Sequence, residues 1–272
     1  MNLVVYNKSG SYTGFLGNVL FQTAATIGIA VKNGMEFSFP HKSYYDSFCG
    51  KIPTGDCSNI IAQDYTEQNY HYDEVILNQG QNYNLKGYFQ SERYWEHCVP
   101  LIKEMFTFAP LNLNEVSENS LLFYKASRFS ITVSLHVRRG DYLALPEYHP
   151  ILPMQYYIDA AKELLEQLDP RCSIKFIVFS NDFDWCKEHL SKEPIFADRL
   201  IFMEGNSAEV DLHFMSKCHH HIIANSSMSW WGSYLSEDEN KIVYAPSKDK
   251  WYGEKYKDWK LDDLYRKEWK LI

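Results

Sequence analysis

Residues 129–141 read FSITVSLHVRRGD, and this stretch decides the fold of the second half of the chain. Its apolar residues fall at positions 129, 131, 133, 135 and 137, a strict period of two that predicts a β-strand. Arg138 and Arg139 follow directly. Ligands of open parallel sheets bind beyond the carboxyl ends of the strands. We therefore expect the strand to lie in the core and the two arginines that follow it to border a ligand-binding site.

The chain beyond this strand alternates between helix and strand patterns. Pro153 opens an amphipathic helix, which Asp169 and Pro170 end. Further strands are expected at 174–179, 200–203, 221–224 and 241–245, and further helices at 183–190, 208–218 and 227–235. Five strands alternating with four helices indicate a parallel sheet with right-handed crossovers, which is a Rossmann-like domain.

The first half of the chain has weaker patterns. We expect a strand at 3–6, a turn rich in glycine and serine at 9–17, a helix at 18–32 and another at 91–105. This is a second α/β start, so we predict two lobes, 1–128 and 129–272. The tail from Ser247 onward, rich in tryptophan and charge, is expected to pack back on the first lobe.

Composition and charge exclude several classes of protein. The 272 residues carry a net charge of −8, which argues against generic nucleic-acid binding because that needs a basic face. The longest apolar stretch, 15–31, is interrupted by polar residues and falls short of the roughly 18 apolar residues of a membrane span. Six cysteines without a C-x-x-C pair and no secretion signal predict a cytoplasmic protein with reduced thiols, associated with membranes at most peripherally.

Three of the expected strands end in unusual polar groups. These are Arg138 and Arg139, then 180–182, then Asn225, Ser226 and Ser227. Guanidinium groups form paired hydrogen bonds with phosphate oxygens, and the amides and hydroxyls at a helix N-terminus hold the remaining ones. The coincidence of the three ends in one sheet predicts a diphosphate site.

Three other patterns have competing interpretations. The histidines 219–221, with His213 nearby, suggest a metal, but consecutive side chains on a strand point to alternate faces and do not converge on one ion. Residues 139–141 form an R-G-D tripeptide, which is an adhesion signal in extracellular proteins. Adhesion requires an exposed secreted loop, and the sequence shows no secretion signal, so this interpretation is disfavoured. Trp230 and Trp231 fit a core and site wall better than a stacking platform.

Five ordered motifs resemble those of the bacterial and animal alpha-1,2-fucosyltransferases. The segment 136–142, HVRRGDY, is similar to the H-x-R-R-x-D motif that this family shares with alpha-1,6- and protein O-fucosyltransferases. The others are GFLGNVLFQ at 14–22, GYFQSE at 87–92, FSNDFDW at 179–185, and the block 211–232. Four positions depart from the family pattern: Phe15, Val19, Asn181 and Met228.

The resemblance implies a fold and an activity. The fold is α/β and GT-B-like, with two Rossmann-like lobes and the active site in the cleft between them. The first lobe, 1–128, is then expected to be the acceptor side, and the second, 129–272, to bind GDP-fucose. The activity is transfer of L-fucose from GDP-β-L-fucose to the 2-hydroxyl of a terminal β-galactoside, with inversion and without a metal or other cofactor. The partners are therefore GDP-fucose and a galactose-terminated glycan, with lactose, N-acetyllactosamine, type 1 chains and a lipid-linked O-antigen repeat all open as acceptors.

The resemblance also implies roles for individual residues. Arg138 is expected to stabilise the departing β-phosphate, and Asp211 to bind guanine. The general base is expected to be Glu147 first and Asp141 second, with His149 on the same loop. The expected substrate-binding residues are Gly14, Gly17, Asn18, His136, Arg139, Asp182, Asp211, Asn225, Ser226 and Ser227.

Two further interpretations stay open. One is an enzyme that transfers another GDP-sugar, or transfers fucose to a different acceptor carbon. The other is a non-catalytic protein of the same fold that binds a nucleotide or glycan without turnover.

Overall fold

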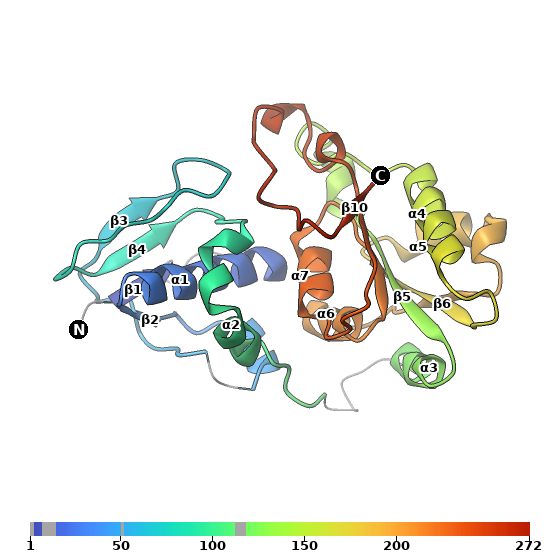
Figure 1. Ribbon diagram of the computed structural model, residues 1–272, viewed down its shortest axis with the longest axis horizontal. Coiled ribbons are helices and arrows are strands. Elements are labelled where there is room, and N and C mark those ends of the chain that lie inside the picture. The colour runs from blue at the N-terminus through green and yellow to red at the C-terminus, as the bar shows by residue number, and fades with distance from the viewer. Residues whose placement is uncertain (1–2, 7–14, 50–51, 112–117) are drawn as a thin grey trace. The chain divides into compact units, whose positions relative to one another are not determined.

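The computed structural model describes residues 3–6, 15–49, 52–111 and 118–272. The chain divides into two compact units, whose segments can be located by residue number with the colour bar of Figure 1. Unit 1 comprises Met1–Pro110 and Trp259–Arg266, and unit 2 comprises Leu111–Asp258 and Lys267–Ile272.

The division falls at residue 110 rather than at residue 128 because of the helix α3, Glu118–Ser127. Its Phe123 is buried against Phe214 of unit 2, with ring centroids 5.0 Å apart. The apolar face of this helix therefore belongs to the second unit.

Unit 1 is built on a four-stranded parallel sheet in the order β2-β1-β4-β3. Its strands are β1 (Leu3–Tyr6), β2 (Glu36–Ser38), β3 (Gln63–Thr66) and β4 (Tyr83–Lys86). The helix α1 (Leu16–Lys32) follows β1 and is almost entirely buried. The expected strand at 3–6 is confirmed, and the expected helix begins two residues earlier than 18.

The segment 91–105 is not one helix, contrary to the sequence prediction. Two short 3-10 turns, Glu92–Tyr94 and Glu96–Cys98, precede α2, which spans Val99–Met105. Pro100 lies in the first turn of α2, where its missing N–H costs no hydrogen bond. The turns lie so close to α1 that a Cβ on Gly28 would meet the Tyr94 carbonyl oxygen at 2.1 Å.

Unit 2 contains a six-stranded sheet in the order β10-β9-β8-β5-β6-β7, and all of its pairings are parallel. The strands are β5 (Ile131–Val137), β6 (Ile174–Ser180), β7 (Leu200–Phe202), β8 (His220–Ile222), β9 (Val243–Ala245) and β10 (Lys270–Leu271). The helices between them are α4 (Met154–Gln167), α5 (Phe183–His189), α6 (Ala208–Ser216) and α7 (Ser227–Leu235). The expected alternation of strands and helices is confirmed, and the two-residue β10 is an addition.

Helices cover both faces of the unit 2 sheet (Figure 1). Val133, Leu135 and Val137 of β5 pack with α4 in one core cluster. Phe179 of β6 packs with Phe214 of α6 in the other. Burial on both sides leaves the carboxyl edge of the sheet as the place where polar groups from neighbouring strands meet.

None of the helices in the described ranges combines the length and hydropathy needed to cross a membrane.

Candidate functional site

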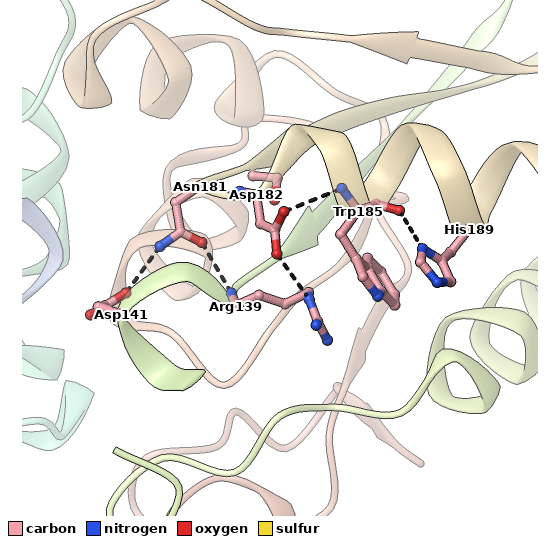
Figure 2. A network of polar contacts seen from close by, with 7 residues as sticks. Arg139, Asp141, Asn181, Asp182, Trp185 and His189 are labelled. Carbon is pink, nitrogen blue, oxygen red and sulfur yellow. Dashed lines mark hydrogen bonds and ion pairs between the residues drawn. The ribbon is translucent and has the colours of Figure 1, made fainter. Parts of the chain in front are cut away.

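The polar strand ends of unit 2 come together because β8, β5 and β6 are neighbours in the sheet. The register pairs Val137 with Ser180, so β5 and β6 end at the same level. Arg138 and Arg139 follow β5, and Asn181 and Asp182 follow β6. Arg139, Asn181 and Asp182 form one continuous polar network with Asp141, shown in Figure 2. Arg138 joins this network through its hydrogen bond to Asp141.

Asn181 joins the two strand ends. Its side-chain oxygen accepts a hydrogen bond from the Arg139 backbone N–H at 3.0 Å, and its amide nitrogen donates to Asp141 at 3.0 Å (Figure 2). A Cβ on Gly140 would lie 2.5 Å from that amide nitrogen, so a larger residue at 140 would push the bridge apart. The asparagine therefore determines how the arginine loop leaves the sheet.

Arg139 is held by an acid and an aromatic ring. Its Nε donates to Asp182 at 3.2 Å, and its guanidinium lies 4.2 Å from the centre of the Trp185 ring (Figure 2). Asp182 also accepts from the Trp185 backbone N–H and thereby caps α5. Trp185 in turn stacks on His189 with centroids 4.8 Å apart. These contacts anchor Arg139 within the protein.

Arg138 has a different set of partners. Its Nη2 lies 2.9 Å from the Asp141 carboxylate, and its guanidinium lies 5.3 Å from the centre of the Tyr142 ring. The Tyr142 hydroxyl donates to the Asn225 carbonyl oxygen at 3.0 Å, which connects this loop to the end of β8. Arg138 is thus a fixed cation, and its side chain is 17% exposed.

His136 lies on β5, two residues before Arg138, and is only 3% exposed. Burial, with a smaller contribution from the Arg138 charge, lowers the pKa of His136 to about 3. Its Nδ1 has no hydrogen-bond partner among the described residues. The imidazole is therefore neutral at physiological pH.

The third strand end combines a structural tie with a helix N-terminus. Asn225 is 2% exposed, and its amide nitrogen donates to the carbonyl oxygens of Pro150 at 2.9 Å and Trp251 at 3.2 Å. Ser226 is the N-cap residue of α7, but its side chain makes no capping hydrogen bond, and Ser227 is the first residue of the helix. The start of α7 therefore presents its first amides at the same sheet edge, an arrangement suited to anions.

Asp211 lies in the first turn of α6, after β7. Burial raises its pKa to about 7, while a hydrogen bond at 3.0 Å from the Asn206 amide lowers the pKa by a smaller amount. Ser207 caps the same helix through its side chain. Asp211 is thus a half-buried residue whose carboxyl group lies beside the amide of Asn206, with a protonation state that changes near neutral pH.

The loop after the arginines is bound to the segment 252–256. Gly253 N–H donates to the Tyr148 carbonyl oxygen at 2.9 Å, and Lys255 N–H donates to that of Glu147 at 3.0 Å. The Glu147 side chain is exposed and lies 3.6 Å from the Lys255 ammonium. His149 stacks on Tyr142 with centroids 4.4 Å apart, and burial lowers the pKa of His149.

The remaining predicted residues lie in unit 1 or outside the described residues. Gly14 lies outside the described residues. Gly17 and Asn18 are in the first turn of α1, where Asn18 accepts a hydrogen bond from the Gln90 amide at 2.9 Å. Unit 2 thus assembles Arg138, Arg139, Asp141, Asp182 and Asn225 into one connected set of contacts, and Gly17 and Asn18 belong to the other unit.

Sequence analysis missed the supporting roles of Asn181, Tyr142, Trp185 and Asn206. The position of Asn181 immediately after a predicted strand was the one available signal. The ring contacts of Tyr142 and Trp185 with the two arginines depend on how the loops fold, so no spacing indicates them.

The histidine run lies at the opposite, amino end of β8. His219 Nδ1 accepts from the Thr132 backbone N–H at 3.1 Å, and His220 Nδ1 accepts from the Ile242 N–H at 3.1 Å. Within the described part of the chain, no group of three or more His, Cys, Asp or Glu side chains is arranged to hold a metal ion. Trp230 and Trp231 are fully buried, which confirms their assignment to the core.

The fold and the site define an α/β unit with a parallel sheet and a preorganised cationic strand end. The chain belongs to glycosyl transferase family 11, whose profile matches residues 5–272. The recognition of this family from sequence is thereby confirmed.

Two curated relatives show the range of this likeness. An alpha-1,2-colitosyltransferase of Escherichia coli is 40% identical over 167 residues, which are 59% of this chain and 54% of the relative. A galactoside alpha-(1,2)-fucosyltransferase 2 of Bos taurus is 28% identical over 241 residues, which are 83% of this chain and 68% of the relative. The match thus spans about half the length of the colitosyltransferase.

Among solved structures, the NodZ alpha-1,6-fucosyltransferase co-crystallised with GDP is similar, with a TM-score of 0.56. NodZ is a protein of Bradyrhizobium and is 13% identical to this chain. The alignment covers 86% of this chain and 92% of NodZ. This likeness confirms the predicted α/β, GT-B-like fold class.

Proposed function

We propose that this protein transfers L-fucose from GDP-β-L-fucose to the 2-hydroxyl of a terminal β-galactoside, with inversion and without a metal ion. The observation that carries the proposal is the fixed cation Arg138 at a parallel-sheet edge in a chain of glycosyl transferase family 11. The bovine relative, named as a galactoside alpha-(1,2)-fucosyltransferase, supports the acceptor and the linkage.

The proposed reaction includes two changes of charge that the protein must stabilise. The departing GDP gains negative charge on its β-phosphate, and the acceptor hydroxyl must lose a proton. Arg138 donates to the β-phosphate, and the N-terminus of α7, with Ser226 and Ser227, binds the same diphosphate. Asp211 accepts the N1 and N2 protons of guanine and thereby selects the nucleotide.

A second candidate is the transfer of colitose from its nucleotide-activated form. It is favoured by the relative named as an alpha-1,2-colitosyltransferase, whose identity of 40% exceeds that of the bovine relative. Colitose differs from fucose by the absence of one hydroxyl group. Contacts of the sugar site with that hydroxyl therefore determine which of the two donors is preferred.

The test is a panel of GDP-sugars and glycans, with products measured by mass spectrometry and the linkage determined by NMR. Release of GDP from GDP-fucose that depends on a β-galactoside, with an α-1,2-linked product, supports the proposal. Preference for GDP-colitose supports the second candidate. Binding of GDP-fucose with no product from any acceptor contradicts both and indicates a binding protein.

The two adjacent arginines are expected to differ. Arg138→Ala should reduce turnover by roughly 10²–10³-fold because it removes a preorganised cation from the leaving group. Arg138→Lys should recover little, since one ammonium does not reproduce a guanidinium fork. Steady-state turnover and GDP affinity by calorimetry are the measurements.

Arg139→Ala is the matched control. Arg139 pairs with Asp182, the N-cap residue of α5, whereas Arg138 pairs with Asp141 only three residues along its own loop. Loss of Arg139 should therefore lower the melting temperature more than Arg138→Ala does and affect turnover less. Near-normal turnover of Arg138→Ala would overturn the assignment.

Guanine binding should depend on pH through Asp211. Its pKa in the free protein is about 7, and only the carboxylate accepts both guanine protons, so lowering the pH protonates the acceptor and weakens binding. The ionised fraction falls about tenfold from pH 8 to pH 6, so the affinity for GDP should fall by a similar factor.

Calorimetry with GDP at several pH values measures this dependence. The variant Asp211→Asn should bind more weakly and retain only the slope caused by titration of the diphosphate itself. Equal slopes for the two proteins would show that Asp211 does not contact the base, as would retention of the preference for GDP over ADP in the variant.

Metal independence is a separate prediction. With Arg138 and the α7 N-terminus at the diphosphate, no divalent ion is needed to neutralise it. Asp182 and Asp184 fit a D-x-D pattern in sequence, but Asp182 is engaged in capping α5. Turnover should survive an excess of EDTA; its loss, with recovery on adding Mg²⁺ or Mn²⁺, would contradict the prediction.

The general base is proposed to be Glu147, with Asp141 as the alternative. The Asp141 carboxylate already accepts hydrogen bonds from Arg138 and Asn181, whereas Glu147 has an exposed carboxylate beside Lys255. Glu147→Gln should therefore reduce turnover by roughly 10²–10⁴-fold while GDP affinity stays unchanged.

Two variants serve as comparisons for this prediction. Lys255→Met removes the exposed ion pair but keeps the carboxylate, so its turnover should stay near that of the unmodified protein. Asp141→Asn tests the alternative. Normal turnover of Glu147→Gln eliminates Glu147 as the base.

A further inference from the structure

The loop 87–91 follows β4 and lies at the carboxyl edge of the unit 1 sheet. In that sheet β4 is between β1 and β3, and all three strands run in parallel. Glu67 directly follows β3, and Asn18, at the start of α1, comes after β1. Residues from three separate stretches of sequence therefore meet where parallel sheets bind ligands.

The backbone of this loop is held in an unfavourable conformation. Phe89 has a φ of +51°, in the left-handed region that non-glycine residues rarely adopt. The Glu67 carboxylate accepts from both the Tyr88 N–H at 2.7 Å and the Phe89 N–H at 3.0 Å. Gly87, with a φ of +152°, would place a Cβ 2.4 Å from the Cβ of Glu67, so only glycine allows this approach. Strain that is enforced from several sides is typical of binding and catalytic loops.

Hydrogen bonds from buried polar side chains also hold the same loop in place. The Gln22 amide nitrogen donates to the Gly87 carbonyl oxygen at 2.7 Å, and Gln22 is 2% exposed. Its side-chain oxygen is buried without a hydrogen-bond partner among the described residues, an uncommon state that occurs at functional sites. Gln90 links Asn18, to which it donates at 2.9 Å, with Tyr70, from which it accepts at 2.5 Å.

The result is a rigid loop that presents one side chain. Phe89, Gln90 and Ser91 are all buried, and Tyr88 between them and Gly87 is 39% exposed. A tyrosine held in this way offers a large, amphipathic surface at little further cost in conformational entropy. The C–H groups on one face of a galactopyranose ring match such a surface, and its hydroxyls match amide groups such as that of Asn18.

We propose that Tyr88, at the carboxyl edge of the unit 1 sheet, packs its ring against the apolar face of the terminal galactoside. The inference rests on the proposed fucosyl transfer, and it adds the residue that selects the acceptor. Glu67 acts as a positioning residue, because its carboxylate holds the loop that presents Tyr88.

The test compares Tyr88→Ala, Tyr88→Phe and the control Ile61→Ala, with lactose as the probe galactoside. Ile61 is in the same unit and 90% exposed, so its truncation removes a comparable exposed group away from the loop. Tyr88→Ala should raise the acceptor KM by about tenfold, the size expected for truncation of an aromatic contact. Tyr88→Phe should stay close to the unmodified protein, and Ile61→Ala should have no effect.

Donor binding separates this inference from the proposed function. GDP affinity and the hydrolysis of GDP-fucose without acceptor should be the same in all three variants and in the unmodified protein. If the unmodified protein does not transfer fucose to lactose, fails in the donor and acceptor panel and does not bind GDP, the proposed function and this inference fail together. If it transfers fucose and Tyr88→Ala has an unchanged acceptor KM, the inference alone is overturned.

A double-mutant cycle tests the positioning role of Glu67. A glutamine offers one acceptor oxygen in place of two, so Glu67→Gln leaves one of the two loop N–H groups without its partner. It should raise the acceptor KM in the unmodified background and have little further effect in Tyr88→Ala, because the two residues act through the same contact. Full additivity of the two effects contradicts the inference.

Discussion

The in-register pairing of β5 with β6 is the constraint on which the unit 2 site depends. Because Val137 lies opposite Ser180, the two strands end together and Asn181 reaches both the Arg139 backbone and Asp141. A slip of one residue would turn every side chain of one strand to the opposite face and separate the bridge from the loop. The cation site is therefore a consequence of strand register, which the packing of both faces of the sheet enforces.

The two positive charges at the site are balanced by neighbouring carboxylates of this acidic chain. Each arginine is paired with a carboxylate and an aromatic ring, Arg138 with Asp141 and Tyr142, and Arg139 with Asp182 and Trp185. Removing charges from water is costly unless they are paired and hydrogen-bonded. The pairs thus allow two adjacent cations to persist at a partly buried strand end, fixed in position before any anion arrives.

The same principle of parallel-sheet edges operates in both units, with different chemistry. Unit 2 places cations and a helix N-terminus at its edge, which suits a diphosphate. Unit 1 places a strained loop, a tyrosine and side-chain amides at its edge, which suits a neutral polyhydroxylated ligand. In each case a small residue, Gly140 or Gly87, allows an acidic or amide side chain to approach the backbone closely.

The sequence by itself determined the alternating elements of unit 2, because buried parallel strands and amphipathic helices have strong periodic patterns, and it located the polar ends of three strands. It did not indicate β2, β3, β4 or β10, whose sequences EFS, QDYT, YNLK and KL mix polar with apolar residues and lack the apolar runs of β1, β7 and β9. Only the tertiary structure decided that Asn181 bridges two strand ends, that Trp185 covers Arg139, and that burial raises the pKa of Asp211 to about 7. Contacts such as Asn181 with Asp141 join residues 40 positions apart, and crossover connections and strand register create them rather than any local preference of the chain.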